Sequence, residues 1–482
     1  MIESGSGTAQ DNVLGKSVQG ATYNVAVSAV TMVLGLVRSV LLMRFLGPDE
    51  FGYVSLALFF AVLFSHLSTL GLDSALVQRP SLKSATLSTH LTLRIGLSVV
   101  VLLLVLGLAP LLRSLYAGQA IVVDLLVELL LANLLPASFS TPNALLRREL
   151  RFGALAVLNL LSSVAMTVGA PLLAFWGAGV WSLVFEQVVG YVVRWVGIWV
   201  VVRPWRPALS IDRVEAQSLL GFGRHVLLSQ FLGITLDRFD DFWAGTTLGA
   251  TALGIYSRAY EIAGYPARVL ATPVTHVFYS TFSALRENKP ELTKAVTLSS
   301  SFLVRTGFWI SSVLLIVIPE ATLILLDPSW LPIVPVFRLM TVYIVLDPLY
   351  TNLSYLVIGL GRPEFLVRVR LGQVVLFVTA VVGLARGWGI EGIAVAANLT
   401  MLSGVVALLF YCTRCVHFEF ARVLGWPTCA LLAASAVGVA LSLGIRWPGL
   451  WMALVAKALS VSLVFALVLF GAERRNLLEY GR

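Results

Sequence analysis

Four polar residues in the second half of the chain share one face of a predicted membrane helix and could bind an anion. Arg258, Glu261, Tyr265 and Arg268 follow one another at spacings of three, four and three residues, which keeps them on one side of a helix. A charge near the centre of a membrane helix costs about 2.5–3.5 kcal/mol, so such residues usually face a cavity or a partner. Glu261 can neutralise either arginine but not both. The remaining positive charge favours an anionic ligand.

The first predicted membrane helix carries a second candidate group. Asn24 and Arg38 end a polar stripe that runs through Ser28, Thr31 and Gly35 at spacings of four and three residues. Small and hydroxyl residues of this kind are typical of contacts between membrane helices. The charge of Arg38, in contrast, favours a position on a cavity, with Asn24 on the same face.

Two later predicted helices each carry a single charge whose partner the sequence does not identify. These charges are Arg305 and Asp347. We group Arg305 with the candidate cavity residues, because its charge has the sign that an anionic ligand requires.

A third group lies in the run LDRFDDFW, residues 236–243. Arg238 is three residues from Asp241, which is close enough for the two to pair on a helix. With Asp237 and Asp240 they form either a periplasmic gate or cavity wall at the outer end of the helix, or a solvated helix end. These acids and Glu261 could carry protons or sodium for transport, or they could be counter-ions, and the sequence leaves both possibilities open.

The composition shows what kind of element positions these residues. Of 482 residues, 58% are hydrophobic and 12% are charged, and the mean hydropathy is +0.90. Soluble domains contain roughly 45–50% apolar and about 25% charged residues. The apolar residues form long continuous blocks rather than alternating ten-residue segments, so the sequence predicts an all-α polytopic membrane protein.

Fourteen membrane-spanning helices are predicted, in two groups of six followed by two more. They cover 18–43, 51–72, 87–112, 120–141, 154–176, 179–202, 219–243, 253–284, 295–318, 332–359, 365–386, 389–411, 424–445 and 449–471. The corresponding parts are a cytoplasmic N-terminal segment (1–17), an N-lobe (18–202), a cytoplasmic linker (203–218), a C-lobe (219–411), the last two helices (412–471) and a cytoplasmic tail (472–482).

The basic residues set the predicted orientation. With both termini in the cytoplasm, twenty Lys and Arg residues fall in cytoplasmic segments and four on the opposite side, as the positive-inside rule requires. The net charge of +9 is therefore a topology signal, and no nucleic-acid partner is expected. The segments LGPDEFGYVS (46–55) and LGATALGIYS (248–257) share a pattern 202 residues apart, which predicts a repeat with parallel halves.

Enzymatic and cofactor-dependent functions lack support in the sequence. The predicted loops are too short for a catalytic domain, and the motifs of a Walker loop, a serine hydrolase and a zinc protease are absent. Cys412 and Cys415 form a CxxC pair without a second pair or a nearby histidine set, so no metal site is expected. We predict a non-enzyme without cofactors.

Several segments together resemble the polysaccharide transporter, or Wzx-type, branch of the multidrug/oligosaccharidyl-lipid/polysaccharide (MOP) superfamily. They are RFLGPDEFGYVSLALFF (44–60), LGLDSALVQR (70–79), NALLRRELRF (143–152), LGATALGIYSRAYEIAGYP (248–266) and IGLGRPEF (358–365). The resemblance implies two six-helix lobes around a central cavity, in the bacterial inner membrane. It implies a flippase that moves undecaprenyl-diphosphate-linked oligosaccharides by alternating access, for exopolysaccharide, capsule or lipopolysaccharide synthesis.

In this interpretation the arginines bind the pyrophosphate, and Tyr256, Tyr260 and Tyr265 contact the sugars. Membrane lipid surrounds the chain, and a polysaccharide polymerase and co-polymerase are the expected protein partners. The rival hypotheses are a multidrug or cation antiporter, whose cavity should be acidic, and a lipid II flippase. A membrane glycosyltransferase or polymerase is the alternative from another class.

Overall fold

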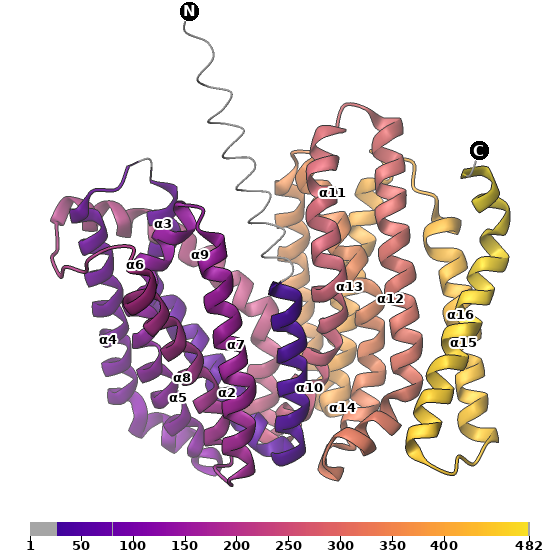
Figure 1. The fold of residues 1–482 in the computed structure, drawn as a ribbon, viewed down its shortest axis with the longest axis horizontal. Coiled ribbons are helices and arrows are strands. Elements are labelled where there is room, and N and C mark those ends of the chain that lie inside the picture. The colour runs from indigo at the N-terminus through magenta and orange to yellow at the C-terminus, as the bar shows by residue number, and fades with distance from the viewer. Residues whose placement is uncertain (1–26, 80, 481–482) are drawn as a thin grey trace, which may run out of the picture. The chain divides into compact units, whose positions relative to one another are not determined.

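The computed structural model describes residues 27–79 and 81–480, with the side chains of all of these except 222–232, 269–270, 276 and 473–480. Every regular element in this part of the chain is a helix, as predicted (Figure 1). Eleven helices in it are long and apolar enough to cross a membrane. The chain is therefore a multi-pass membrane protein, and the total of fourteen spans stays a prediction.

The first of two packed units extends to Gly245. Its helices are Val27–Phe45, α2 (Pro48–Thr69), α3 (Leu72–Gln78), α4 (Ser84–Leu115), α5 (Ile121–Ala132), α6 (Leu134–Arg148), α7 (Phe152–Phe175), α8 (Trp181–Val196) and α9 (Arg213–Trp243). Together, α5 and α6 cover the length of one candidate span, Ile121–Arg148.

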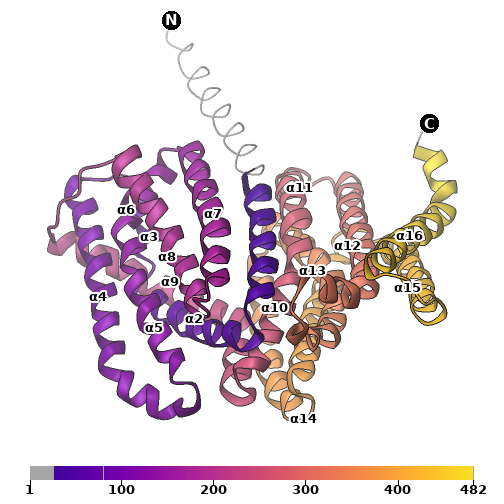
Figure 2. The ribbon, with the colours of Figure 1, turned by 60° about the horizontal axis from the view of Figure 1, so that its bottom comes forward.

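The second unit begins at Thr246. Its helices are α10 (Ala250–Pro266), α11 (Thr272–Ala284), α12 (Lys289–Leu325), α13 (Ile333–Gly359), α14 (Pro363–Cys412), α15 (Trp426–Gly444) and α16 (Leu450–Tyr480). One hydrophobic core joins α12, α13 and α14 to the last two helices. In Figure 2, α15 and α16 lie side by side at the C-terminal end of the chain.

A backbone break divides the longest helix, α14. Gly389 has φ 58° and ψ −136°, a conformation that glycine adopts easily because it has no Cβ. The break falls at the first residue of the predicted span 389–411, directly after the span 365–386, so the two predicted helices correspond to the two arms of α14.

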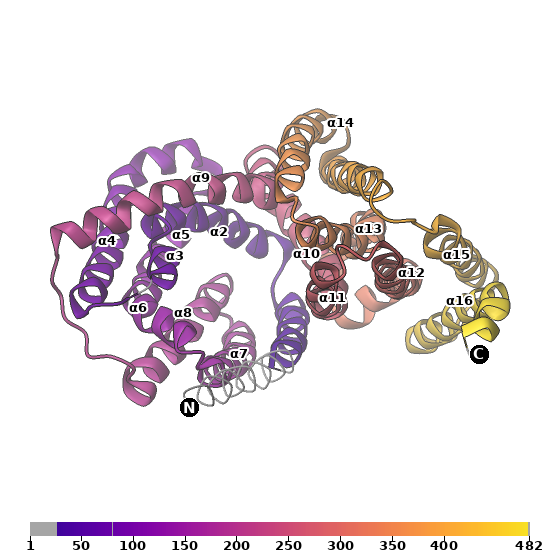
Figure 3. The same cartoon turned by 90° about the horizontal axis from the view of Figure 1, so that it is seen from above.

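The polar helix α9 packs within the first unit, whereas the predicted division assigns residues 219–243 to the second lobe. Leu219 is fully buried against Leu72 and Ala75 near one end of α9. Near the other end, the ring centres of Phe242 and of Phe59 on α2 are 5.2 Å apart. Figure 3 shows α9 running over α2. These apolar contacts hold α9 to the unit that precedes it.

The repeated sequence pattern marks the same structural position in both units. Its first glycine is the N-cap residue of a helix each time, Gly47 before α2 and Gly249 before α10. Glu50 accepts a hydrogen bond from the Gly47 amide at 2.9 Å, which satisfies one free donor of the helix start. Gly249 has φ +93°, a conformation that favours glycine.

Candidate functional site

The structure brings together the four polar residues that the sequence places on one helix face. The Arg258 Nη1 atom lies 2.5 Å from the Glu261 Oε2 atom. The guanidinium of Arg268 lies 4.6 Å above the centre of the Tyr265 ring, at cation–π distance. Its Nη2 atom donates a hydrogen bond of 2.8 Å to the backbone oxygen of Glu261. The Glu261 carboxylate therefore pairs with Arg258, and Arg268 contacts only the backbone of Glu261.

A local irregularity of the helix positions Arg268. The α10 helix ends at Pro266, whose ring removes a backbone donor, and residues Ala267–Ala271 form a π-helical turn before α11. Single π-turns change the direction of the side chains that follow, and they occur often at functional sites. Arg268 lies in this turn and is exposed.

A second acid near Arg268 reduces the positive surplus that the sequence suggests. Asp347 on α13 interacts with the charge of Arg268, and its carboxylate accepts a hydrogen bond from Thr351. Arg258 and Arg268 are thus matched by Glu261 and Asp347. No spacing in the sequence reveals this partner, because the π-helical turn of Arg268 and α13 meet only through tertiary packing.

The three tyrosines of the second unit differ in their surroundings. Tyr256 is fully buried and stacks on Tyr260, with 6.1 Å between ring centres. The hydroxyl of Tyr260 is 3.2 Å from that of Tyr343. Tyr256 is therefore a core residue, contrary to its predicted contact with sugars, while Tyr265 lies under Arg268.

Arg38 pairs with an acid on another helix of the first unit. Its Nε atom lies 2.9 Å from the Glu186 Oε1 atom on α8, and the two side chains are 16% and 14% exposed. Asn24, its predicted neighbour, lies outside the described residues. The charge of Arg38 is therefore matched within its own unit, a pairing that residues 148 positions apart do not reveal in sequence.

The predicted pair at the end of α9 is confirmed. Arg238 Nη1 lies 3.0 Å from Asp241 Oδ2. Asp240 and Asp241 are buried and Asp237 is exposed, so the acids of this run do not share one environment. Arg305 is half-buried on α12 in the second unit, whereas Arg38 and the α9 acids belong to the first.

The structure contains a polar cluster in the first unit that the sequence analysis missed. His90 is fully buried on α4, with Nδ1 2.8 Å from the Thr141 hydroxyl and Nε2 3.3 Å from Asp73 Oδ1. The Nε atom of Arg94 lies 3.4 Å from the same Asp73 oxygen, and its Nη1 atom donates to the Ser68 carbonyl at 3.0 Å. His90 and Arg94, at i and i+4, were the available signal for this cluster.

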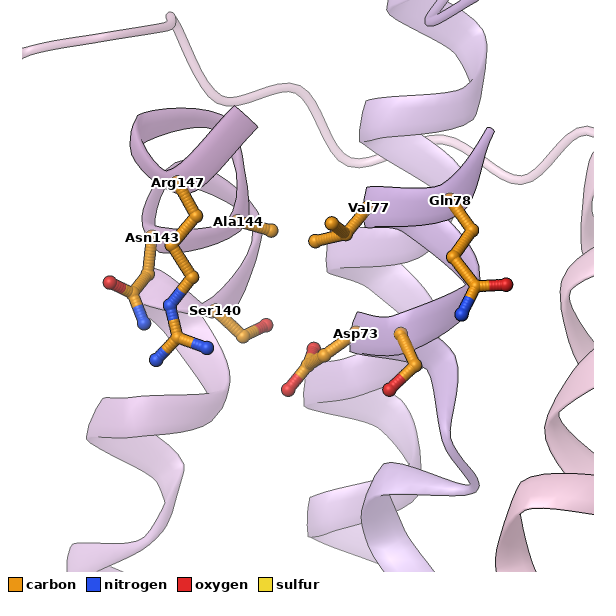
Figure 4. A pocket seen from close by; sticks show the side chains of 8 residues that line it. Asp73, Val77, Gln78, Ser140, Asn143, Ala144 and Arg147 are labelled. Atoms are coloured by element: carbon orange, nitrogen blue, oxygen red, sulfur yellow. The ribbon is translucent and has the colours of Figure 1, made fainter. Parts of the chain in front are cut away.

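Burial raises the pKa of the Asp73 carboxyl, but His90 and the positive charge of Arg94 outweigh this effect. The net pKa lies below its ordinary value, so Asp73 is ionised at neutral pH. Beside it, α3 and α6 line an open cavity of about 290 Å³ (Figure 4). Its lining residues are Asp73, Ser74, Val77, Gln78, Ser140, Asn143, Ala144 and Arg147.

Comparison with known families identifies the chain. Residues 41–335 match the model of the family described as polysaccharide biosynthesis protein. The chain belongs to this family. The match covers more than half of the sequence and spans the boundary between the two units. It confirms the resemblance to polysaccharide transporters.

Curated relatives of this polysaccharide biosynthesis family are similar over most of their length. The lipopolysaccharide biosynthesis protein WzxC of Escherichia coli is 22% identical over 82% of this chain and 80% of its own. The succinoglycan biosynthesis transport protein ExoT of Rhizobium meliloti is 27% identical over 95% of this chain and 94% of its own. Proteins of this family thus occur in polysaccharide biosynthesis and transport.

Solved structures support the fold of this polysaccharide biosynthesis family member. The lipid II flippase MurJ in its inward closed conformation aligns with a TM-score of 0.73 at 13% identity, over 94% of this chain and 99% of its own. A multidrug resistance MATE family transporter in its inward-facing conformation aligns with a TM-score of 0.54 at 19% identity, over 80% of this chain and 94% of its own. The fold is that of the MOP superfamily, whose members among these neighbours are transporters and flippases rather than enzymes.

Proposed function

We propose that the protein flips undecaprenyl-diphosphate-linked oligosaccharide repeat units across the bacterial inner membrane by alternating access, with both termini in the cytoplasm. The family match and the relatives in lipopolysaccharide and succinoglycan synthesis support the substrate class. No enzymatic step and no cofactor is required for this role.

The observation that carries the proposal is the environment of Arg268. Its guanidinium is exposed, rests on the face of Tyr265 and donates to a neutral backbone carbonyl, so it retains donors for a ligand. A planar guanidinium can bind two phosphate oxygens at once, which suits a diphosphate. The half-buried Arg305 adds positive charge in the same unit, and Arg258 is held in place by Glu261.

Arg38 has a different part in this proposal. Its pairing with Glu186 lowers the cost of holding a charge in the membrane, and a diphosphate competes with that carboxylate for the guanidinium. Asp237, Arg238, Asp240 and Asp241 are proposed to couple or gate transport at the outer end of α9.

Deletion of the gene tests the proposed function. Undecaprenyl-linked repeat units should accumulate in the cytoplasmic leaflet, and secreted or surface polysaccharide should be lost. Wild-type protein should restore export, whereas Arg268→Ala should lower it at least tenfold. Arg286→Gln is the matched control, because it removes a positive charge from a highly exposed site that pairs with the adjacent Glu287.

The opposite result favours another transporter. Unchanged lipid-linked sugars together with increased sensitivity to cationic dyes would exclude the flippase and support a cation antiporter. If lipid II accumulates rather than polysaccharide repeat units, the substrate of this protein would be lipid II, as for MurJ.

A further inference from the structure

The cavity between α3 and α6 contains an arginine that contacts no acid among the residues the structure describes. Arg147 belongs to the last turn of α6, where a positive charge often caps the free carbonyls of the helix end. Its neighbour Arg148 donates instead to the carbonyl of Arg79. In Figure 4 the side chain of Arg147 runs back along α6 beside Asn143 and Ser140, away from that helix end. Its guanidinium thus faces the cavity.

The charges around this cavity do not balance. Asp73 is its one acidic lining residue, and it is in contact with Arg94 and His90. Arg147 interacts with Asp73 only at longer range, and it repels the charge of Arg194 on α8. Neither Arg147 nor Arg194 forms an ion pair with any described residue, and the Nε atom of Arg194 is buried without a hydrogen-bond partner there. Among the described residues, no acid in contact with Arg147 compensates its charge.

The remaining lining groups are suited to an anion. Ser74, Gln78 and Asn143 supply hydroxyl and amide donors around the cavity, whereas the Ser140 hydroxyl donates to the Ala137 carbonyl. A cavity needs about 10–15 Å³ of accessible volume to hold one water molecule, so about 290 Å³ accommodates a phosphate or diphosphate group. Polar donors beside an unpaired guanidinium are the typical surroundings of a bound phosphate.

The position of the cavity indicates where the anion comes from. The ends of α3 and α6 at Arg79 and Arg148 lie on the side that the basic residues assign to the cytoplasm. Trp205 packs there against a cluster that includes Leu76 and Ala144, and tryptophan is enriched at the depth of lipid headgroups. Basic pockets at this level of a membrane protein bind lipid phosphates.

We propose that this cavity binds the phosphate or diphosphate headgroup of a lipid in the cytoplasmic leaflet, with Arg147 as the charged donor. This inference rests on the proposed function in one respect, since the lipid-linked substrate is the intended ligand. The cavity is separate from the α10 group, because all of its lining residues lie on α3 and α6 of the first unit.

Binding of undecaprenyl phosphate to the full-length protein in nanodiscs tests this assignment. The measurement uses a background of Arg258→Gln and Arg268→Gln, so that the signal reports the cavity and not the α10 group. Arg147→Gln in this background should weaken binding at least tenfold. Arg147→Lys should restore part of the affinity, since it keeps the charge but lacks the planar fork.

Two further variants separate binding from general damage. Arg151→Gln removes an equal charge three residues after α6 and should change the affinity less than twofold. Asp73→Asn removes the carboxylate that opposes an anion and should tighten binding, a gain that misfolding does not produce. A competition experiment with inorganic pyrophosphate distinguishes the two sources of phosphate. If pyrophosphate displaces undecaprenyl phosphate at a similar concentration, the ligand is a free anion rather than a lipid.

The failure of this proposal differs from the failure of the proposed function. The cavity site would be overturned if the background variant does not bind undecaprenyl phosphate, or if Arg147→Gln and Arg151→Gln lose affinity equally. Neither result would contradict the export of polysaccharide in cells. Unchanged lipid-linked sugars after gene deletion, with binding that depends on Arg147, would overturn the flippase and retain the site.

Discussion

The Nε atom of Arg38 lies 2.9 Å from a carboxylate oxygen of Glu186, and this pair joins the first helix of the described chain to α8. Both side chains are about one-seventh exposed. An isolated arginine in the membrane is costly, so the partner explains how the first helix tolerates its charge. The partial exposure leaves both groups within reach of a ligand.

We expect the two members of this pair to be energetically coupled. Arg38→Gln and Glu186→Gln should each destabilise the protein, because each leaves one charge without its partner, and the double variant should be less destabilised than the sum. A coupling of about 0.5–3 kcal/mol is typical of residues in contact. Thermal unfolding in detergent measures it, and strict additivity would contradict the pairing.

Loss of one partner should cost more stability in the ion pair between Lys457 on α16 and Glu320 on α12 than in the pair of Arg38 and Glu186. The two side chains are 5% and 12% exposed. Lys457→Met leaves a buried carboxylate alone, which typically costs about 3–5 kcal/mol, whereas Lys457→Met with Glu320→Leu should recover most of the stability. Unfolding curves of the three proteins decide this, and a double variant as unstable as the single one would refute it.

Acidification should remove the contribution of Asp73 to stability. Its pKa in the folded protein lies below the ordinary 3.8, so the stabilisation is complete above that value and is lost as the pH falls through the lower, folded pKa. Asp73→Asn should therefore be less stable than wild type at neutral pH, with a difference that shrinks below pH 3.8. A difference that is constant from neutral to acid pH would show that the charge of Asp73 is not responsible.

The packing of α9 into the first unit gives a matched pair of variants. Leu219 is fully buried and Leu220 is 37% exposed. Leu219→Ala should cost about 2–5 kcal/mol of stability, as for other buried leucines. Leu220→Ala should cost much less. Limited proteolysis between Arg203 and Arg213 and thermal unfolding both measure the effect, and similar losses for the two variants would contradict this packing.

Features that depend on local sequence were predicted well. The apolar blocks predicted the helices, the two matching segments lie at equivalent helix starts, and a spacing of three residues predicted the contact of Arg238 with Asp241. The residues that make up each of these signals are close together in the sequence.

The partners of the other charges could not be predicted, because they are distant in sequence. Glu186 is 148 positions from Arg38, and Glu320 is 137 from Lys457. Each pair forms only when two particular helices pack. The cluster of Asp73, His90 and Arg94 was missed for the same reason: its acid lies on a different helix from its bases.

The attachment of α9 has a consequence for biosynthesis. The helix is not among the strongly apolar candidate spans, and it packs on α2, α3 and α4, which are made before it. A ribosome therefore has to synthesise the chain as far as Trp243 before the first unit can close. A fragment cut at residue 202 would emerge with Leu72 and Ala75 uncovered, so the shortest self-sufficient N-terminal fragment ends after α9.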